Sequence, residues 1–142
     1  MILYDYVGRR GAATAKKTND EEVKGEIRRW QDGLPTPQRA QLDEKLFTLE
    51  GTSDLSLLPG LIAGPIKHRP HIYKLRVGGK VRLRPLLCRG PFDPDVELTF
   101  LASATERDNV LEPPGALDIA ERRRTEVISN EEYRAPYVSP TR

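Results

Sequence analysis

The sequence predicts an α+β fold: a small antiparallel sheet with an N-terminal helical pair and a C-terminal helix on one side. Two successive segments near the N-terminus carry apolar residues at helical spacing. Three apolar segments, separated by glycine-containing turns, then follow one another between residues 72 and 102. Because these strands are neighbours along the chain, we expect them to pair antiparallel instead of alternating with helices. The sheet face without helices would be open to solvent or to a ligand.

The composition predicts one domain. The chain has 142 residues, of which 37% are hydrophobic and 31% charged, which suits one core and is short for two. We expect a single domain over residues 1–129 and a flexible tail over residues 130–142, where prolines oppose regular structure. The N-terminal residues do not follow the signal-peptide pattern, and no segment reaches the roughly 20 apolar residues of a membrane span. We therefore expect a cytoplasmic protein.

The cysteine and histidine content predicts neither a disulfide nor a metal site. The single cysteine, Cys88, excludes an intramolecular disulfide, and we interpret it as a small buried apolar residue. Two clustered histidines beside one cysteine lack the spacing of a zinc site. No metal or other cofactor is expected.

The N-terminal part of the chain predicts one strand, a loop and a helix. Ile2–Val7 is β-branched and aromatic, which favours a strand that ends at Gly8. Residues 9–18 are basic and small, and we expect a loop there. A helix then begins at a cap among Thr18, Asn19 and Asp20 and ends at Gly33. Its apolar stripe consists of Val23, Ile27 and Trp30, and we interpret the tryptophan as a core residue.

Two further helices and three strands complete the expected fold. A helix from Thr36 begins with a proline in its first turn and ends at Gly51. Its apolar stripe is Leu42, Leu46 and Leu49. The last helix follows Pro113-Pro114 and runs to about Ser129. The three strands are expected at Ile72–Val77, Val81–Cys88 and Val96–Ala102.

The register of the first hairpin decides where its charged side chains lie. Residues directly opposite each other in an antiparallel pair share one face of the sheet. A two-residue loop at Gly78-Gly79 would mix apolar and charged residues on both faces, whereas a three-residue loop that includes Lys80 separates them. We therefore predict the pairs Val77–Val81, Arg76–Arg82, Leu75–Leu83 and Lys74–Arg84. One face is then apolar, and the other holds Lys74, Arg76, Arg82 and Arg84.

Positive charge is concentrated in this part of a nearly balanced chain. The chain has 23 Lys+Arg against 21 Asp+Glu, but no acidic residue lies between Leu55 and Phe92. The basic residues there are Lys67, Arg69, Lys74, Arg76, Lys80, Arg82, Arg84 and Arg89, with His68 and His71 among them. Like charges opposite each other destabilise a hairpin, and guanidinium groups suit phosphate oxygens, so the pattern indicates an anion site. The alternative is a solvated face, screened by salt or paired with acidic residues of the final helix.

Three segments together resemble the toxins of the RelE/HigB superfamily, in particular the phage-derived Gp49-like branch. They are IYKLRVGGKVRLRPLL, ELTFLA and EPPGALDIAERRR. The resemblance covers roughly residues 20–128, and its motifs are short. It implies a RelE-like α+β fold and a ribosome-dependent endoribonuclease that cleaves mRNA without a metal. It also implies a cognate antitoxin as the protein partner and no membrane association.

The resemblance assigns roles to individual residues. Arg76 matches the arginine of the first hairpin strand and Arg82 that of the second, and Arg84 would clamp phosphate on the same face. The ribose 2′-hydroxyl would attack the adjacent phosphate while these side chains stabilise the developing charge. The remaining basic residues expected to bind nucleic acid are Lys67, Arg69, Lys74, Lys80 and Arg89.

The segment after the third strand departs from the family pattern. Catalytic members often carry a Phe-x-Lys-Lys-type segment there, whereas this chain has Arg107 between Glu106 and Asp108. The two acids would weaken an anionic site, so Arg107 is the one basic candidate there. Tyr133 could reach back, as some family C-terminal tyrosines do, or simply be solvated.

Each histidine has a functional and an ordinary interpretation. A histidine is a plausible general acid or base for RNA cleavage. His68, in the loop before the hairpin, is the better candidate, because His71 alternates onto the face opposite the charged pairs. The alternative is that His68 simply belongs to the basic surface.

The sequence leaves three functions open. The first is the mRNA-cleaving toxin. The second is a non-catalytic RelE-fold protein, from a phage or its host, that binds nucleic acid or a protein partner through the same basic face. The third is a structural or assembly protein whose basic face meets an acidic partner. Glu106 and Asp108 favour the second function over the first.

Overall fold

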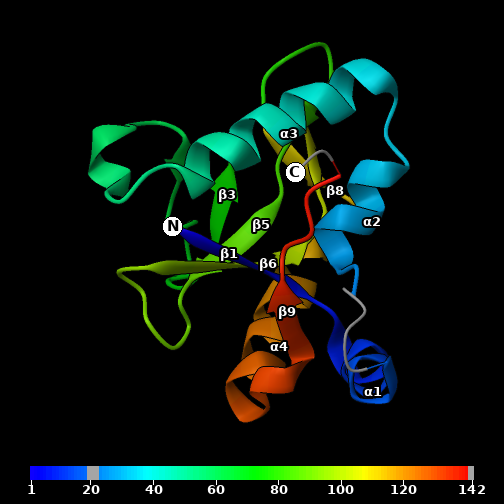
Figure 1. Cartoon of the computed structure of the whole chain (residues 1–142). Coiled ribbons are helices and arrows are strands. Elements are labelled where there is room, and N and C mark those ends of the chain that lie inside the picture. The colour runs from blue at the N-terminus through cyan, green and yellow to red at the C-terminus, as the bar shows by residue number, and fades with distance from the viewer. Residues whose placement is uncertain (19–22, 141–142) are drawn as a thin grey trace.

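The computed structural model describes residues 1–18 and 23–140, which form a mixed α+β fold around a mostly antiparallel sheet (Figure 1). The main sheet has the strand order β2-β3-β5-β6-β1-β9, and β4, β7 and β8 form a second, smaller sheet. The strands are β1 (Ile2–Tyr6), β2 (Ile62–Ala63), β3 (Tyr73–Leu75), β4 (Arg82–Leu83), β5 (Leu86–Arg89), β6 (Glu97–Ala102), β7 (Thr105–Arg107), β8 (Val110–Glu112) and β9 (Arg134–Pro136). The α-helices are α1 (Gly8–Thr18), α2 (Glu26–Asp32), α3 (Thr36–Glu50) and α4 (Ala116–Ser129), and short 3-10 turns lie at Leu55–Leu57 and Glu131–Tyr133. The N-terminal strand β1 runs parallel to β6, and the neighbours in the rest of the main sheet are antiparallel.

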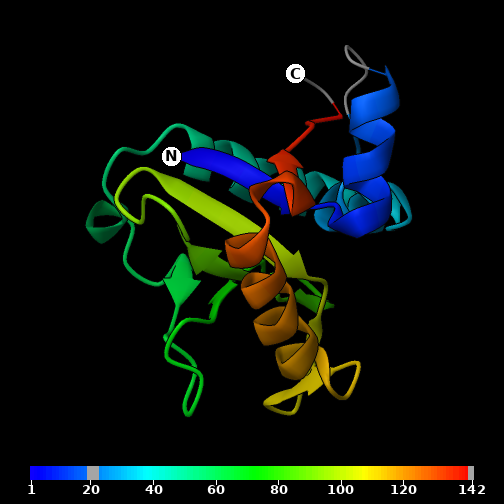
Figure 2. The same ribbon diagram turned by 90° about the horizontal axis from the view of Figure 1, so that it is seen from below.

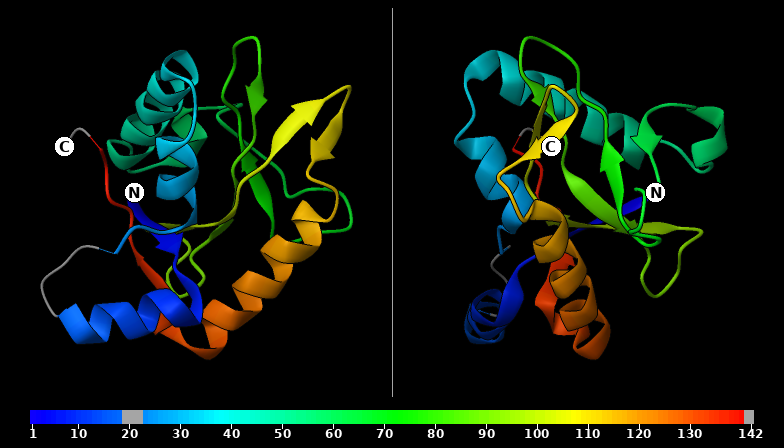
Figure 3. Two further views of the ribbon diagram at one scale, coloured as in Figure 1. Left: turned by 90° about the vertical axis from the view of Figure 1, so that its right-hand side faces the viewer. Right: turned by 180° about the vertical axis from the view of Figure 1, so that it is seen from behind.

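Helices cover both faces of the main sheet, which corrects the expectation that they all lie on one side. Figure 2 shows α4 along one face, and Figure 3 shows α2 and α3 on the other. The central strand β6 explains the difference, because all six of its residues are buried. Leu98 and Phe100 belong to the core beneath α3, whereas Leu101 and Ala102 belong to the core beneath Ala116 and Ala120 of α4. A central strand that is apolar on both faces needs a layer on each side.

Of the two helices predicted near the N-terminus, the structure matches one closely and the other only in part. Helix α3 matches the prediction, with Leu42, Leu46 and Leu49 all fully buried. Helix α2 is shorter than predicted, and two of its expected caps, Asn19 and Asp20, lie outside the described residues. Its N-terminus is instead capped by the buried carboxylate of Asp5, which accepts hydrogen bonds from the backbone N–H groups of Ile27 and Arg28. A Cβ atom at Gly25 would lie 2.6 Å from the Asp5 Cγ, so this close approach requires glycine.

The loop expected at residues 9–18 is a helix, α1, which packs against the turn at Glu131–Tyr133 and the end of α4. Alanine and lysine, which make up much of this segment, are strong helix formers, and their small or basic character does not by itself indicate a loop. Ala12 is buried, and Lys16 forms an ion pair with Glu132.

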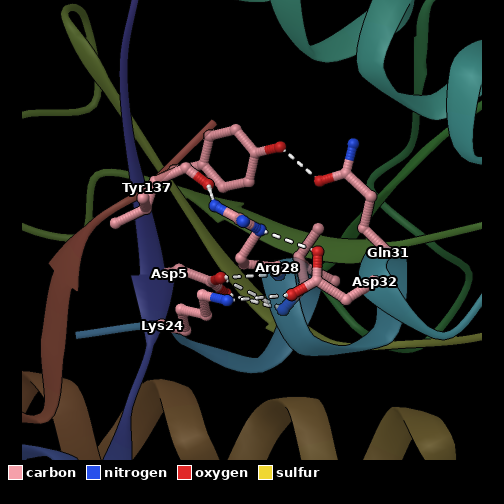
Figure 4. A network of polar contacts seen from close by, with 8 residues as sticks. Asp5, Lys24, Arg28, Gln31, Asp32 and Tyr137 are labelled. Atoms are coloured by element: carbon pink, nitrogen blue, oxygen red, sulfur yellow. Dashed lines mark hydrogen bonds and ion pairs between the residues drawn. The ribbon is translucent and has the colours of Figure 1, made fainter. Parts of the chain in front are cut away.

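Residues 130–140, most of the expected flexible tail, are built into the fold, and residues 141–142 lie outside the described part of the chain. Strand β9 pairs with β1, and Arg134 is buried in an ion pair with Glu97 while its guanidinium lies 3.7 Å from the centre of the Tyr4 ring. Beyond the strand, Tyr137 donates a hydrogen bond to the side chain of Gln31, and Arg28 donates to the carbonyl of Val138 (Figure 4). These contacts join the C-terminal segment to α2.

Candidate nucleic-acid interface

The cations predicted for the hairpin do lie on one face, although their register differs from the prediction. Val77 pairs with Leu83 instead of Val81, so the loop between them has five residues. Lys74 pairs with Leu86, two positions beyond its predicted partner Arg84. A shift of two residues keeps the paired side chains on their predicted faces, whereas Val81, predicted on the apolar face, is exposed in the loop. Leu75, Val77 and Leu83 are accordingly fully buried, and the charged side chains point the other way.

We call the resulting charged cluster the hairpin surface and define it as Lys74, Arg76, Lys80, Arg82, Arg84 and Glu106. Arg76, Lys80 and Arg82 are exposed, and within the described part of the chain none of them forms a direct ion pair. These three cations are therefore free to meet an external anion.

Arg84 is a brace of the hairpin rather than an exposed phosphate ligand. Its side chain is buried, and one terminal nitrogen donates to the carbonyls of Val77 and Leu83 at 3.1 and 2.8 Å. Burial lowers the pKa of Arg84, Glu106 opposes this change, and the nearby charges of Arg76 and Arg82 add to it. Arg76 and Arg82 are the chain neighbours of Val77 and Leu83, whose carbonyls the Arg84 guanidinium contacts. Arg84 thus contributes positive potential to the surface while its hydrogen bonds stay inside the fold.

Glu106 supplies negative charge in the middle of these cations. Its carboxylate lies 2.7 Å from Lys74 Nζ and 3.7 Å from Arg84 Nε, and strand β7 sets it opposite Arg82. The hydrogen bond from Lys74 holds the pKa of Glu106 below its ordinary value. The shifted register removes Arg76 from its predicted position opposite Arg82, and on the other edge of β4 Arg82 pairs with Glu106. This acid reduces the net charge of the site, and Lys74 is not free.

A cleft of roughly 440 Å³ adjoins the hairpin surface. Lys74 and Glu106 form part of its wall, and the β7–β8 hairpin and the first turn of α4 form the rest. Arg69 lies at this cleft, but its guanidinium is held by Asp118 and Glu121 of α4, each at 2.5 Å. For Arg69 the alternative interpretation applies, because acidic residues of the final helix neutralise it.

The other predicted site residues are spread around the molecule. Lys67 and His68 are exposed in the turn that Ile66 and Arg69 close, where His68 has a φ of 65°. Arg107 is exposed at the end of β7, beside the turn at Asp108 and Asn109. Arg89 is exposed at the end of β5 that points away from the hairpin. The structure therefore brings together Arg76, Arg82 and Arg84 with Lys74, and Lys80 lies in the loop of the same hairpin. His68 is not among the residues that line the cleft.

Cys88 is buried as expected, and burial raises the pKa of its thiol to about 11. Trp30 is partly buried and packs against the core beneath α3. Tyr133 lies in the 3-10 turn that packs on α1, away from the hairpin surface.

Searches for other kinds of site and for relatives add no further assignment. Among residues 1–18 and 23–140, no three His, Cys, Asp or Glu side chains are grouped as a metal site would need. No helix in the same part of the chain is long and apolar enough to cross a membrane. Comparison with family models, curated proteins and solved structures finds no match.

Proposed function

We propose that this protein is an mRNA-cleaving toxin of the RelE/HigB kind, which binds the phosphate backbone of RNA at the hairpin surface. The observation that carries the proposal is that Arg76 and Arg82 are exposed, without ion-pair partners among the described residues, and adjacent in the chain to Val77 and Leu83, on whose carbonyls the buried Arg84 guanidinium is held. Bidentate guanidinium groups match phosphate oxygens and stay charged at any physiological pH. The expected partners are mRNA on the ribosome and a cognate antitoxin.

The chemistry that this surface supports is attack of a ribose 2′-hydroxyl on the neighbouring phosphate. The new 2′-O–P bond gives a 2′,3′-cyclic phosphate as the P–O5′ bond breaks, and solvent water accepts the 2′ proton and protonates the departing 5′-oxygen. Arg76 and Arg82 would stabilise the charge that develops on the phosphoryl oxygens. Glu106 is the carboxylate closest to them, but a pKa held low by Lys74 makes it a weak proton acceptor. Most of the rate enhancement would therefore come from positioning and charge stabilisation. No step of this reaction requires a metal ion.

Primer extension on an mRNA in a translating cell-free extract tests the proposal. The wild-type protein should produce discrete new 5′ ends that require ribosomes. The Arg76→Ala/Arg82→Ala variant should lose them, since both free phosphate ligands are gone. Arg9→Ala/Arg10→Ala is the matched control, because it removes two exposed charges from α1 and should leave the cleavage pattern unchanged. Intact messages at high concentrations of folded wild-type protein would exclude the nuclease.

Glu106 favours a second candidate, a RelE-fold protein that binds RNA through the same surface without cleaving it. A carboxylate engaged by Lys74 and facing Arg84 lowers the potential that a transition state would use. This candidate predicts RNA binding that depends on Arg76 and Arg82 together with intact messages in the primer-extension assay. The toxin predicts that binding and cleavage are lost together in the double variant.

A further inference from the structure

A second group of cations lies away from the hairpin surface, in a separate pocket of roughly 350 Å³. Three elements that are distant in the sequence supply them: His71 precedes β3, Arg89 ends β5, and Arg124 comes from α4. Tyr73 and three prolines, Pro70, Pro91 and Pro94, form the less polar part of the wall, and Asp95 is the one acidic residue among the lining residues. No residue of the hairpin surface lines this pocket.

Arg124 is the least satisfied of these cations. It is only partly exposed, its Nε is buried without a hydrogen-bond partner, and it forms no ion pair within the described part of the chain. The guanidinium lies close enough to β5 for its charge to offset part of the burial-driven rise in the pKa of Cys88. A buried donor that makes no hydrogen bond is costly. An anion in the pocket would meet the terminal nitrogens of this guanidinium, and its charge would compensate a side chain that makes no ion pair within the described part of the chain.

Neighbouring acids do not neutralise this pocket. Glu121, one turn earlier on α4, is held by Arg69. Glu97, on the strand next to β5, is buried in its ion pair with Arg134. Asp95 is exposed and balances one of the two arginines. Asp54 does not line the pocket, but it lies close enough to Arg89 for that charge to contribute to the lowering of the Asp54 pKa, after the larger effect of hydrogen bonds from Ser56. Among the lining residues two guanidinium groups meet one carboxylate, and Arg124 is the arginine whose charge is less compensated.

We propose that this pocket binds a phosphate monoester carried by a nucleotide, with Arg89 and Arg124 on the phosphate. The pocket volume falls at the small end of ligand sites and suits a single nucleotide unit. The Tyr73 ring and the proline walls offer apolar surface against which a base or sugar can pack. A terminal phosphate has more charge than a bridging one, which favours the end of an RNA or a free nucleotide over an internal phosphodiester. The proposal does not depend on the activity of the hairpin surface.

Nuclear magnetic resonance titration of the full chain tests the proposal, with the Arg124 Nε–Hε resonance as the reporter. The probes are inorganic phosphate, uridine 5′-monophosphate, and a tetrauridylate with either a 5′-phosphate or a 5′-hydroxyl. Inorganic phosphate, uridine 5′-monophosphate and the 5′-phosphorylated tetrauridylate should shift the Arg124 resonance saturably. The 5′-hydroxyl tetrauridylate, which has only internal phosphodiesters, should not. Comparison of the mononucleotide with the 5′-phosphorylated oligonucleotide then shows whether the phosphate comes from a free nucleotide or from an RNA end.

Variants separate a built pocket from general electrostatic attraction. Arg124→Gln and Arg89→Gln should each weaken binding of the 5′-phosphorylated oligonucleotide by about tenfold, since each removes charge-assisted hydrogen bonds. Asp95→Asn should tighten binding several-fold because it removes the opposing charge. Arg122→Gln, on the same helix but outside the pocket, is the matched control and should change affinity less than twofold.

Two results would overturn the proposal. One is an equal loss of affinity in Arg122→Gln and Arg124→Gln, which would indicate unspecific attraction to α4. The other is the absence of a saturable shift at Arg124 with any phosphate-bearing probe. Because Arg89 and Asp95 are exposed, their variants keep the test valid if Arg124→Gln fails to fold.

Discussion

Glu106 is the single residue that decides how much positive charge the hairpin surface carries. Its carboxylate is nearly buried, hydrogen-bonded to Lys74 and close to Arg84, and it lies across the small sheet from Arg82. A lysine in place of Glu106 would make the same surface strongly basic. With the glutamate, the hairpin surface carries only a moderate positive charge.

Replacing Glu106 with glutamine should tighten RNA binding several-fold and weaken the fold. The charge of Lys74 becomes available to phosphate, whereas the loss of a charge-assisted hydrogen bond costs about 1–3 kcal/mol of folding free energy. Fluorescence anisotropy with a short RNA and urea unfolding measure the two effects. Glu112→Gln, an exposed glutamate on the neighbouring strand, is the control and should change neither. If affinity falls in Glu106→Gln, the carboxylate contacts RNA productively and our account of the charge balance is wrong.

The raised pKa of Asp5 should make the stability of the fold depend on pH. Burial raises the pKa of Asp5 to about 7, despite the hydrogen bonds from Ile27 and Arg28 that oppose the rise. The folded protein therefore holds a proton that the unfolded chain releases near pH 4, so this group favours folding at low pH. Its contribution is lost as the pH rises toward 7.

The Asp5→Asn variant tests this sign. Its free energy of unfolding, minus that of the wild-type protein, should rise between pH 4 and pH 7, because the variant lacks the group that becomes unfavourable. Urea unfolding at several pH values measures the difference, with the exposed Asp95→Asn as control. A flat difference across this range would mean that Asp5 titrates normally in the folded protein.

At the scale of elements, the periodic segments were predictable and the pairings were not. The leucines of α3 recur at helical spacing and are all buried, so sequence pattern alone located that helix. The hairpin strands were placed on the correct faces, because a register error of two residues preserves alternation. The register itself depends on a third strand: β7 pairs with β4 and brings Glu106 opposite Arg82, a contact between residues 24 positions apart. No local pattern encodes which cation such a distant acid will neutralise.

The C-terminal segment also depends on a distant partner that its own sequence does not reveal. Its prolines indicated a mobile tail, yet Arg134 is buried against Glu97 and stacked on Tyr4. An isolated arginine between a tyrosine and an alanine gives no sign of burial in the sequence. Its partner, Glu97, lies in the apolar segment that forms β6. A glutamate in a strand predicted to be buried indicates a buried cationic partner, and this clue was present in the sequence.

Removing this arginine should destabilise the whole fold. Arg134→Met leaves the carboxylate of Glu97 buried without a counter-charge, at a cost of about 3–5 kcal/mol. The double variant Arg134→Met/Glu97→Gln should recover a substantial part of the loss, since the uncompensated charge is gone. Thermal unfolding followed by circular dichroism compares the three proteins. Equal stability of Arg134→Met and the wild-type protein would mean that β9 contributes little to the sheet.

At the scale of the whole molecule, a nearly neutral chain separates its charges in space. Acidic residues of α4 and β7 neutralise Arg69 and Lys74, whereas Arg76, Lys80 and Arg82 are left at the tip of one hairpin. Association with RNA should therefore be local and strongly dependent on salt, because the net charge of +2 gives little general attraction. This property is common to the nuclease and to the non-cleaving binder.

The salt dependence of RNA binding tests the role of the hairpin surface most directly. The dissociation constant of a short single-stranded RNA is measured between 50 and 300 mM salt for the wild-type protein, Arg76→Ala/Arg82→Ala and Arg9→Ala/Arg10→Ala. Each lost phosphate contact lowers the magnitude of the slope of log affinity against log salt by about 0.7. The slope of Arg76→Ala/Arg82→Ala should therefore be smaller in magnitude by about 1.4. The α1 control should retain the wild-type slope. Equal slopes for the wild-type protein and Arg76→Ala/Arg82→Ala would contradict the assignment of these arginines to RNA phosphates.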